Sequence, residues 1–148
     1  MPLKETITED VKAAMRASDK ERLSTLRMLQ AAIKQREVDE RITLDDAQVI
    51  SVLEKMIKQR RESIVQFEQG GRTDLAGKEA GEIALLQRYL PTALTEAEIE
   101  SLIRESIDAT GATSVKDMGK VMAAVKAKAA GRADMGAVSA RIKAALSG

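Results

Sequence analysis

Apolar residues recur at intervals of three and four along nearly the whole of this 148-residue chain. Leu26, Leu29 and Ile33, for example, lie within roughly a third of a turn of one another at about 100° per residue. No segment alternates between apolar and polar residues for long enough to indicate a β-strand. The periodicity therefore predicts an all-α fold.

Capping and helix-breaking residues divide this pattern into seven expected helices. Pro91 is the strongest boundary, because proline disfavours helical geometry in the residue before it. Four expected helices precede it and end near Ser18, Asp39, Gly70 and Leu90. The third of them is expected to begin with a capping box formed by Thr43 and Asp46, and the three helices after Pro91 are expected to begin at the caps Thr95, Ser114 and Asp134. The sequence predicts a four-helix N-terminal domain, residues 1–91, and a three-helix C-terminal domain, residues 92–148.

Several residue types that enzymes commonly use are missing or rare. The chain contains no cysteine and no histidine, which excludes disulfides, thiolate metal sites and the Ser-His-Asp triad. Its aromatic residues are Phe67 and Tyr89, too few for a platform that stacks nucleic-acid bases. We therefore predict no catalytic residue, no metal and no cofactor.

The hydropathy pattern bears on membranes and on location. No run of about 18 apolar residues occurs, so we expect no membrane partner. The first residues include Glu5, Glu9 and Asp10 and lack the apolar stretch of a secretory signal. These observations predict a cytoplasmic location.

Four charged residues fall on or beside the apolar faces of the expected helices. Glu79 and Glu82 lie within the stripe of the fourth helix, Arg60 within that of the third, and Arg22 beside that of the second. A charge directed toward a core must be paired, so we expect structural ion pairs between helices among these arginines and glutamates. The alternative is that Glu79 and Glu82 form an acid/base couple or a metal site. Carboxylate metal sites in helical bundles normally include a histidine, which this chain lacks.

Charge is unevenly distributed in the second half of the chain. Residues 91–113 carry one basic and five acidic residues, whereas residues 114–148 carry seven basic and two acidic ones. Small residues flanked by lysines lie opposite the apolar stripe of the helix after Ser114, a shape that suits a phosphate backbone. Gly119 costs this helix about 1 kcal/mol relative to alanine, so a packing or contact reason for it is expected. The predicted RNA-binding residues are Lys116, Gly119, Lys120, Lys126, Lys128 and Arg132.

This basic face has a second interpretation. Alanine and lysine are good helix formers and are common on solvated helix faces without any ligand. A comparable group on the third helix, Lys55, Lys58 and Arg61, has Glu54 and Glu62 beside it. That arrangement favours a solvated, salt-bridged face, and a phosphate contact surface is the alternative.

Four groups of residues resemble the GatB/YqeY family. They are Arg22-Leu23-x-x-Leu26-Arg27-x-Leu29 with Ala32-Ile33-Lys34, Lys58-Gln59-Arg60-Arg61-Glu62-Ser63, Glu79-x-x-Glu82-Ile83 leading to Tyr89-Leu90-Pro91, and Gly119-Lys120-Val121-Met122 with Gly131-Arg132-Ala133-Asp134. Together they extend over nearly the whole chain, which resembles the YqeY-like proteins of that family. Residues 92–148 are also similar to the C-terminal tail domain of the B subunit of the tRNA-dependent amidotransferase.

The resemblance implies a tRNA-binding or RNA-associated accessory role. In the amidotransferase the tail helps to hold the tRNA, while glutamine hydrolysis and acceptor activation occur in other domains. The resemblance also brings the label of a carbon–nitrogen ligase with glutamine as amido-nitrogen donor. These 148 residues contain neither the amidase nor the kinase-like domain, so we expect no standalone activity.

Three hypotheses about function follow. The first is a helical accessory protein that binds tRNA or an RNA-containing complex. The second is a protein-interaction adaptor that docks on an amidotransferase, a synthetase or another acidic partner. The third is an amide-forming or amide-hydrolysing enzyme, for which only a Ser-Lys nucleophile pair remains chemically available.

Overall fold

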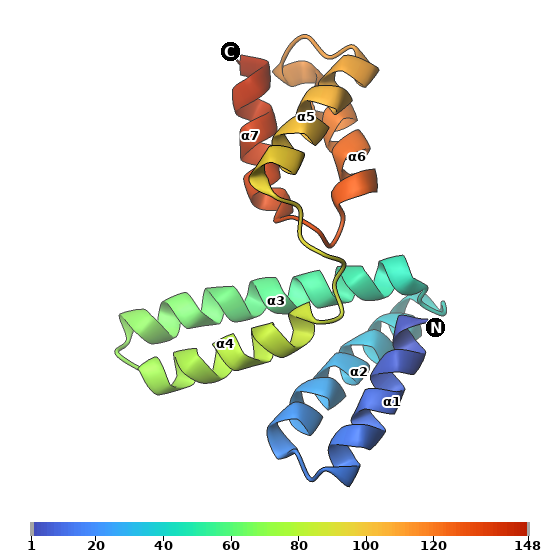
Figure 1. Ribbon diagram of the computed structural model, residues 1–148, viewed down its shortest axis with the longest axis vertical. Coiled ribbons are helices and arrows are strands. Elements are labelled where there is room, and N and C mark those ends of the chain that lie inside the picture. Colours follow the sequence, from blue (N-terminus) through green and yellow to red (C-terminus); the bar gives the residue numbers. More distant parts are fainter. Residues whose placement is uncertain (1, 148) are drawn as a thin grey trace. The chain divides into compact units, whose positions relative to one another are not determined.

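The computed structural model describes residues 2–147, which form seven α-helices, one short 3-10 helix and no strand (Figure 1). This result confirms the all-α fold. The chain folds into two compact units, residues 1–90 and residues 91–148. The helices of the first unit are α1 (Leu3–Arg16), α2 (Lys20–Glu40), α3 (Asp46–Gln69) and α4 (Thr73–Gln87). Those of the second are α5 (Glu96–Thr110), a 3-10 helix (Val115–Asp117), α6 (Met118–Ala129) and α7 (Met135–Ser147).

The first unit consists of two helical hairpins, α1 with α2 and α3 with α4 (Figure 1). Its main core joins all four helices, because Ile7, Leu29, Leu53 and Leu86 each come from a different helix and are almost completely buried. Burial of a leucine or isoleucine side chain contributes about 1.5–3 kcal/mol. The periodic apolar residues therefore account for the assembly of these four helices.

Two helix ends of this unit differ from the sequence prediction. The capping box of α3 is formed by Asp45 and Gln48 rather than by Thr43 and Asp46. Asp46 instead accepts a hydrogen bond from the backbone N–H of Leu3, 2.9 Å away, and so connects α3 to the start of α1. Helix α4 ends at Gln87 rather than at residue 90, because the chain makes a turn before Pro91.

The second unit is a three-helix domain with a core of its own. Val121, Val125 and Ile142 have no measurable exposure and lie in one cluster with residues of α5. Thr95 and Glu98 form the expected capping box of α5. No helix within residues 2–147 is long and apolar enough to cross a membrane.

The ends of the last two helices show one expected cap and one difference. Asp134 accepts a hydrogen bond from the N–H of Gly136 at 3.0 Å, in line with its expected place at the start of α7. Ser114 makes no side-chain cap bond, because a 3-10 helix intervenes before α6. The carboxylate of Asp117 instead accepts the N–H of Thr113.

Candidate nucleic-acid interface

Helix α6 has a buried face and an exposed basic face. Val121 and Val125 are fully buried on one side, and Ala129 is 1% exposed. At about 100° per residue, Lys120 lies on the opposite side of the helix, and Gly119 and Lys126 lie toward one edge of the exposed side. The helix is thus held by its apolar stripe, and its lysines are directed to solvent.

Gly119 lies in the first turn of α6 and is exposed. A Cβ atom built on it would find no neighbouring atom within 4 Å, so packing inside the protein does not require a glycine here. Lys116, in the 3-10 helix directly before α6, is also exposed. We call Lys116, Gly119, Lys120 and Lys126 the α6 basic face.

One carboxylate lies at the start of the α6 basic face. The bond from the Thr113 N–H lowers the pKa of Asp117 below its ordinary value, and Lys120 contributes a smaller decrease. Asp117 is therefore ionised at neutral pH and removes part of the local positive potential. The lysines remain in excess over it.

Lys128 and Arg132 lie apart from that face. They border a groove of about 380 Å³ whose other side is helix α5, including Glu98 and Glu105. Arg132 Nε donates to the carbonyl oxygen of Thr92 at 2.9 Å. Its positive charge also helps to lower the pKa of Glu98, after the larger effect of the hydrogen bond from Thr95. The structure therefore separates the six predicted RNA-binding residues into two groups, and Arg132 has a structural contact of its own.

The four charged residues predicted near the first core form two clusters. In the first, Arg60 Nε lies 2.8 Å from Glu82 Oε2 and 3.9 Å from Glu79 Oε2. The same guanidinium donates to the Met56 carbonyl oxygen at 3.4 Å and lies 3.7 Å from the Met28 sulfur. One arginine therefore serves both glutamates, in direct contact with Glu82 and at a longer distance from Glu79. Among residues 2–147, no three His, Cys, Asp or Glu side chains converge on a metal-sized site.

The second cluster pairs Arg22 with Asp10 rather than with either glutamate. The Arg22 Nη2 and Asp10 Oδ1 atoms are 3.8 Å apart, and Tyr89 donates its hydroxyl to Asp10 Oδ2 at 2.5 Å. Burial, followed by this bond, raises the pKa of Tyr89 well above its usual value. Sequence reasoning missed both Asp10 and Tyr89. The signal in the sequence was a single tyrosine at a helix end, directly before a leucine and a proline.

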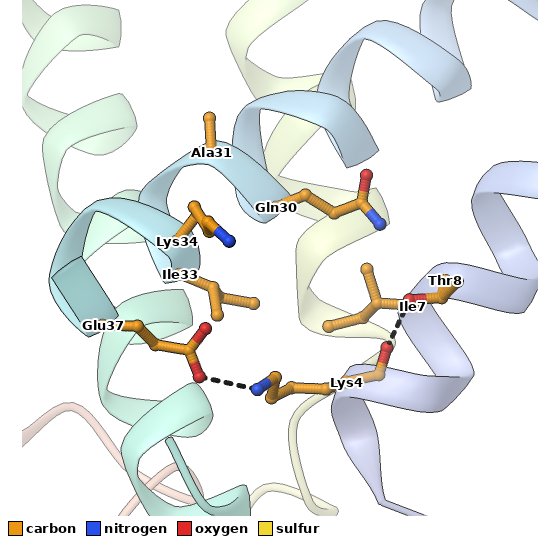
Figure 2. Close-up of a pocket in the computed structure, with 8 residues that line it drawn as sticks. All are labelled: Lys4, Ile7, Thr8, Gln30, Ala31, Ile33, Lys34 and Glu37. Carbon is orange, nitrogen blue, oxygen red and sulfur yellow. Dashed lines mark hydrogen bonds and ion pairs between the residues drawn. The ribbon is translucent and has the colours of Figure 1, made fainter. Parts of the chain in front are cut away.

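A groove between α1 and α2 was also missed. It has a volume of about 400 Å³, and Figure 2 shows Lys4 and Glu37 at one end of it, with Ile7 and Ile33 facing each other. The Lys4 Nζ and Glu37 Oε2 atoms are 2.6 Å apart, and the same oxygen accepts the N–H of Leu44 at 2.8 Å. These two bonds lower the pKa of Glu37 below its ordinary value. Glu37 thereby connects α1, α2 and the loop before α3.

Comparison with known protein families decides the classification. The model of the family described as Yqey-like protein matches residues 4–146. The chain belongs to the YqeY-like family. The YqeY resemblance carried by the four motif groups is thereby confirmed.

Curated relatives of this YqeY-like chain are named altered inheritance of mitochondria protein 41, mitochondrial. The relative from Vanderwaltozyma polyspora is 32% identical over 119 residues, covering 76% of this chain and 64% of the relative. The relative from Eremothecium gossypii is 41% identical over 97 residues, covering 65% of this chain and 52% of the relative. The relative from Pyrenophora tritici-repentis is 33% identical over 126 residues, covering 81% of this chain and 69% of the relative. The matched part of this YqeY-like chain thus spans between about half and two thirds of the length of these relatives.

The names of the relatives correct the predicted location. A cytoplasmic location is contradicted, because the relatives are named as mitochondrial proteins. The physical reason for the error is that the composition and patterning of a cysteine-free helical domain do not differ between the cytoplasm and the interior of a mitochondrion.

Proposed function

We propose that this YqeY-like protein is a tRNA-associated accessory protein that contacts the phosphate backbone through the α6 basic face. The observation that carries the proposal is the group of exposed lysines on the same face as Gly119, whose backbone is not covered by a side chain. Ammonium groups attract phosphates, and a residue without a side chain permits their close approach. The proposal gives the chain a binding role and no amide-forming step of its own.

Two further features support this role. Residues 114–148 carry seven basic and two acidic residues, so the positive charge is concentrated although the chain as a whole is nearly neutral. The resemblance of residues 92–148 to the amidotransferase tail favours tRNA as the ligand, because that tail helps to hold tRNA. It also accounts for the carbon–nitrogen ligase label without requiring that chemistry in this chain.

The test is a salt-dependent titration of the full chain with bulk tRNA and with mitochondrial tRNA. The second ligand is included because the relatives are named as mitochondrial proteins. Each neutralised phosphate releases counterions, so affinity should fall steeply between about 50 and about 200 mM salt. A variant carrying Lys116→Gln, Lys120→Gln and Lys126→Gln should bind more weakly and reduce the slope of log affinity against log salt by about 2 to 3.

A matched control uses the mixed-charge face of α3. Lys55→Gln, Lys58→Gln and Arg61→Gln together remove the same number of positive charges as the α6 variant. Binding by this control should stay close to wild type if the α6 basic face is the contact. An affinity that does not change with salt, or an equal loss in both variants, contradicts the proposal. Absence of tRNA binding leaves the adaptor hypothesis, which is then tested by identifying the protein that co-purifies.

A further inference from the structure

Helix α2 carries a second basic stripe, on the outer side of the first unit. Lys20, Arg27 and Lys34 follow one another at intervals of seven residues, and all three are exposed. Seven residues fall about 20° short of two full turns, so the three side chains lie nearly in line at spacings of about 10.5 Å. We call them the α2 basic stripe.

The residues between the cations on one side of this line are small and exposed, whereas Leu23 and Gln30 on the other side are larger and partly buried. Ser24 and Ala31 lie about 40° to 60° from the neighbouring cations of the stripe, and neither carries a side chain long enough to cover it. No carboxylate of α2 falls within that sector of the helix, since Glu21 and Glu37 project roughly 80° to 120° to either side of Arg27. The stripe is therefore uninterrupted by negative charge from its own helix over about four turns.

The three cations are free of ion pairs with the described part of the chain. Of the salt bridges among residues 2–147, none includes Lys20, Arg27 or Lys34. Lys34 does interact with Glu37 through space and makes a small contribution to lowering its pKa, but the close contacts of that carboxylate are with Lys4 and the Leu44 N–H. Arg22, Arg36, Arg60 and Arg72 of this unit do have such partners, whereas Lys55, Lys58 and Arg61 on α3, like the stripe, are in none of these pairs. This difference distinguishes the stripe from the arginines that stabilise the fold.

The chemistry of the stripe favours a polyanion over a protein surface. Stable protein interfaces are anchored by buried aromatic or large apolar side chains. Along this sector of α2 the only exposed large apolar residue is Val38, at the last turn of the helix. Regularly spaced, exposed cations with small residues along one side instead match a row of phosphates, which needs charge and close approach rather than apolar burial.

We propose that the α2 basic stripe is a second RNA-backbone contact, so that the first unit takes part in binding the same class of ligand as the second. The inference rests on the proposed function for its ligand, and it gives the first unit a task that the α6 basic face does not supply. Phosphate contacts position an RNA without selecting its sequence. The stripe therefore contributes affinity and salt dependence, and no base specificity.

The first test is the tRNA titration applied to a variant with Lys20→Gln, Arg27→Gln and Lys34→Gln. Its affinity at low salt should fall by on the order of tenfold or more, and its log–log salt slope by about 2 to 3. The α3 control with Lys55→Gln, Lys58→Gln and Arg61→Gln has the same net charge and should bind like wild type. Circular dichroism and urea unfolding establish that all variants remain equally folded.

A second test locates the contact without changing any charge. Because the chain contains no cysteine, Ala31→Cys provides a unique attachment for a photo-crosslinker on the stripe. Ala84→Cys, on an exposed position of α4, is the matched control, and Ala123→Cys marks the exposed side of α6. Crosslinks to tRNA are expected from Ala31→Cys and Ala123→Cys, and none from Ala84→Cys.

The outcomes separate this inference from the proposed function. If the α2 variant binds like wild type while the α6 variant loses affinity, the inference is overturned and the proposed function stands. If the α2 variant alone loses affinity, the inference stands and the α6 contact is wrong. An equal loss in the α2 and α3 variants overturns the inference, because the loss then reflects overall charge rather than a contact at the stripe.

Discussion

Arg60 of α3 donates from Nε to Oε2 of Glu82 on α4, at 2.8 Å, and this contact connects the two helices of the second hairpin. The side chains of Arg60 and Glu82 are only 12% and 14% exposed. Glu79, one turn away on α4, lies 3.9 Å from the same Nε atom. Because a charge buried to this extent needs a partner, the pair fixes which turn of α4 faces Arg60.

Loss of Arg60 is expected to destabilise the fold strongly. Arg60→Leu leaves Glu79 and Glu82 close together without a counterion, and removing one partner of a buried pair costs about 3 to 5 kcal/mol. The measurement is the free energy of unfolding in urea. Adding Glu79→Gln and Glu82→Gln to Arg60→Leu should recover much of the loss, since the stranded charges are then gone. Equal stabilities of the single and triple variants would show that charge is not the cause.

The Tyr89 hydroxyl makes the free energy of unfolding of the first unit depend on pH in the alkaline range. Its pKa is raised above the ordinary value of 10.0, so the folded state holds the phenolic proton more tightly than the unfolded state does. The resulting stabilisation is complete below about pH 10 and is lost as the pH rises above it. The free energy of unfolding should therefore decline above about pH 10 in the wild type and decline less in Tyr89→Phe. Identical slopes for the two proteins would contradict this assignment.

Sequence periodicity predicts helices well, because each helix buries one stripe regardless of what packs against it. The helical wheel thus places Arg60 and Glu82 at the core edge. It does not predict that Arg22 pairs with Asp10, because that contact depends on how α1 lies against α2. Nor does it predict the Tyr89 bond to Asp10, which joins residues 79 positions apart.

The same limit explains the division of the predicted RNA-binding residues. A wheel of α6 places Lys126 on the exposed side but Lys128 only about 20° from the buried Val121, at the edge of the apolar stripe, although Lys128 is exposed in the structure. Only the packing of α5 places Glu98 and Glu105 beside Lys128 and Arg132. Local sequence thus indicates which residues are exposed, and tertiary packing determines which charges remain available to a ligand.

Arg132 is expected to act on stability rather than on salt-dependent binding. Arg132→Gln removes the donor to the Thr92 carbonyl, a hydrogen bond whose loss costs on the order of 1 kcal/mol. The variant should unfold at lower urea and keep the wild-type salt slope for tRNA. Lys120→Gln should do the reverse, with unchanged stability and a slope lower by about 0.7 to 0.9. A reduced slope in Arg132→Gln would instead make this arginine a phosphate contact.

Gly119 separates the folding role of α6 from its proposed binding role. A Cβ at this position meets open space, so Gly119→Ala should stabilise the helix, by less than the roughly 0.5 to 1 kcal/mol of a mid-helix glycine because Gly119 is the second residue of α6; urea unfolding measures the gain. If phosphates approach the backbone here, the added methyl group should also weaken tRNA binding. Gly81→Ala on α4 is the matched control, because its Cβ also meets open space, and it should gain stability without losing affinity. A stabilised Gly119→Ala protein with wild-type affinity would show that the RNA does not approach α6 at this glycine.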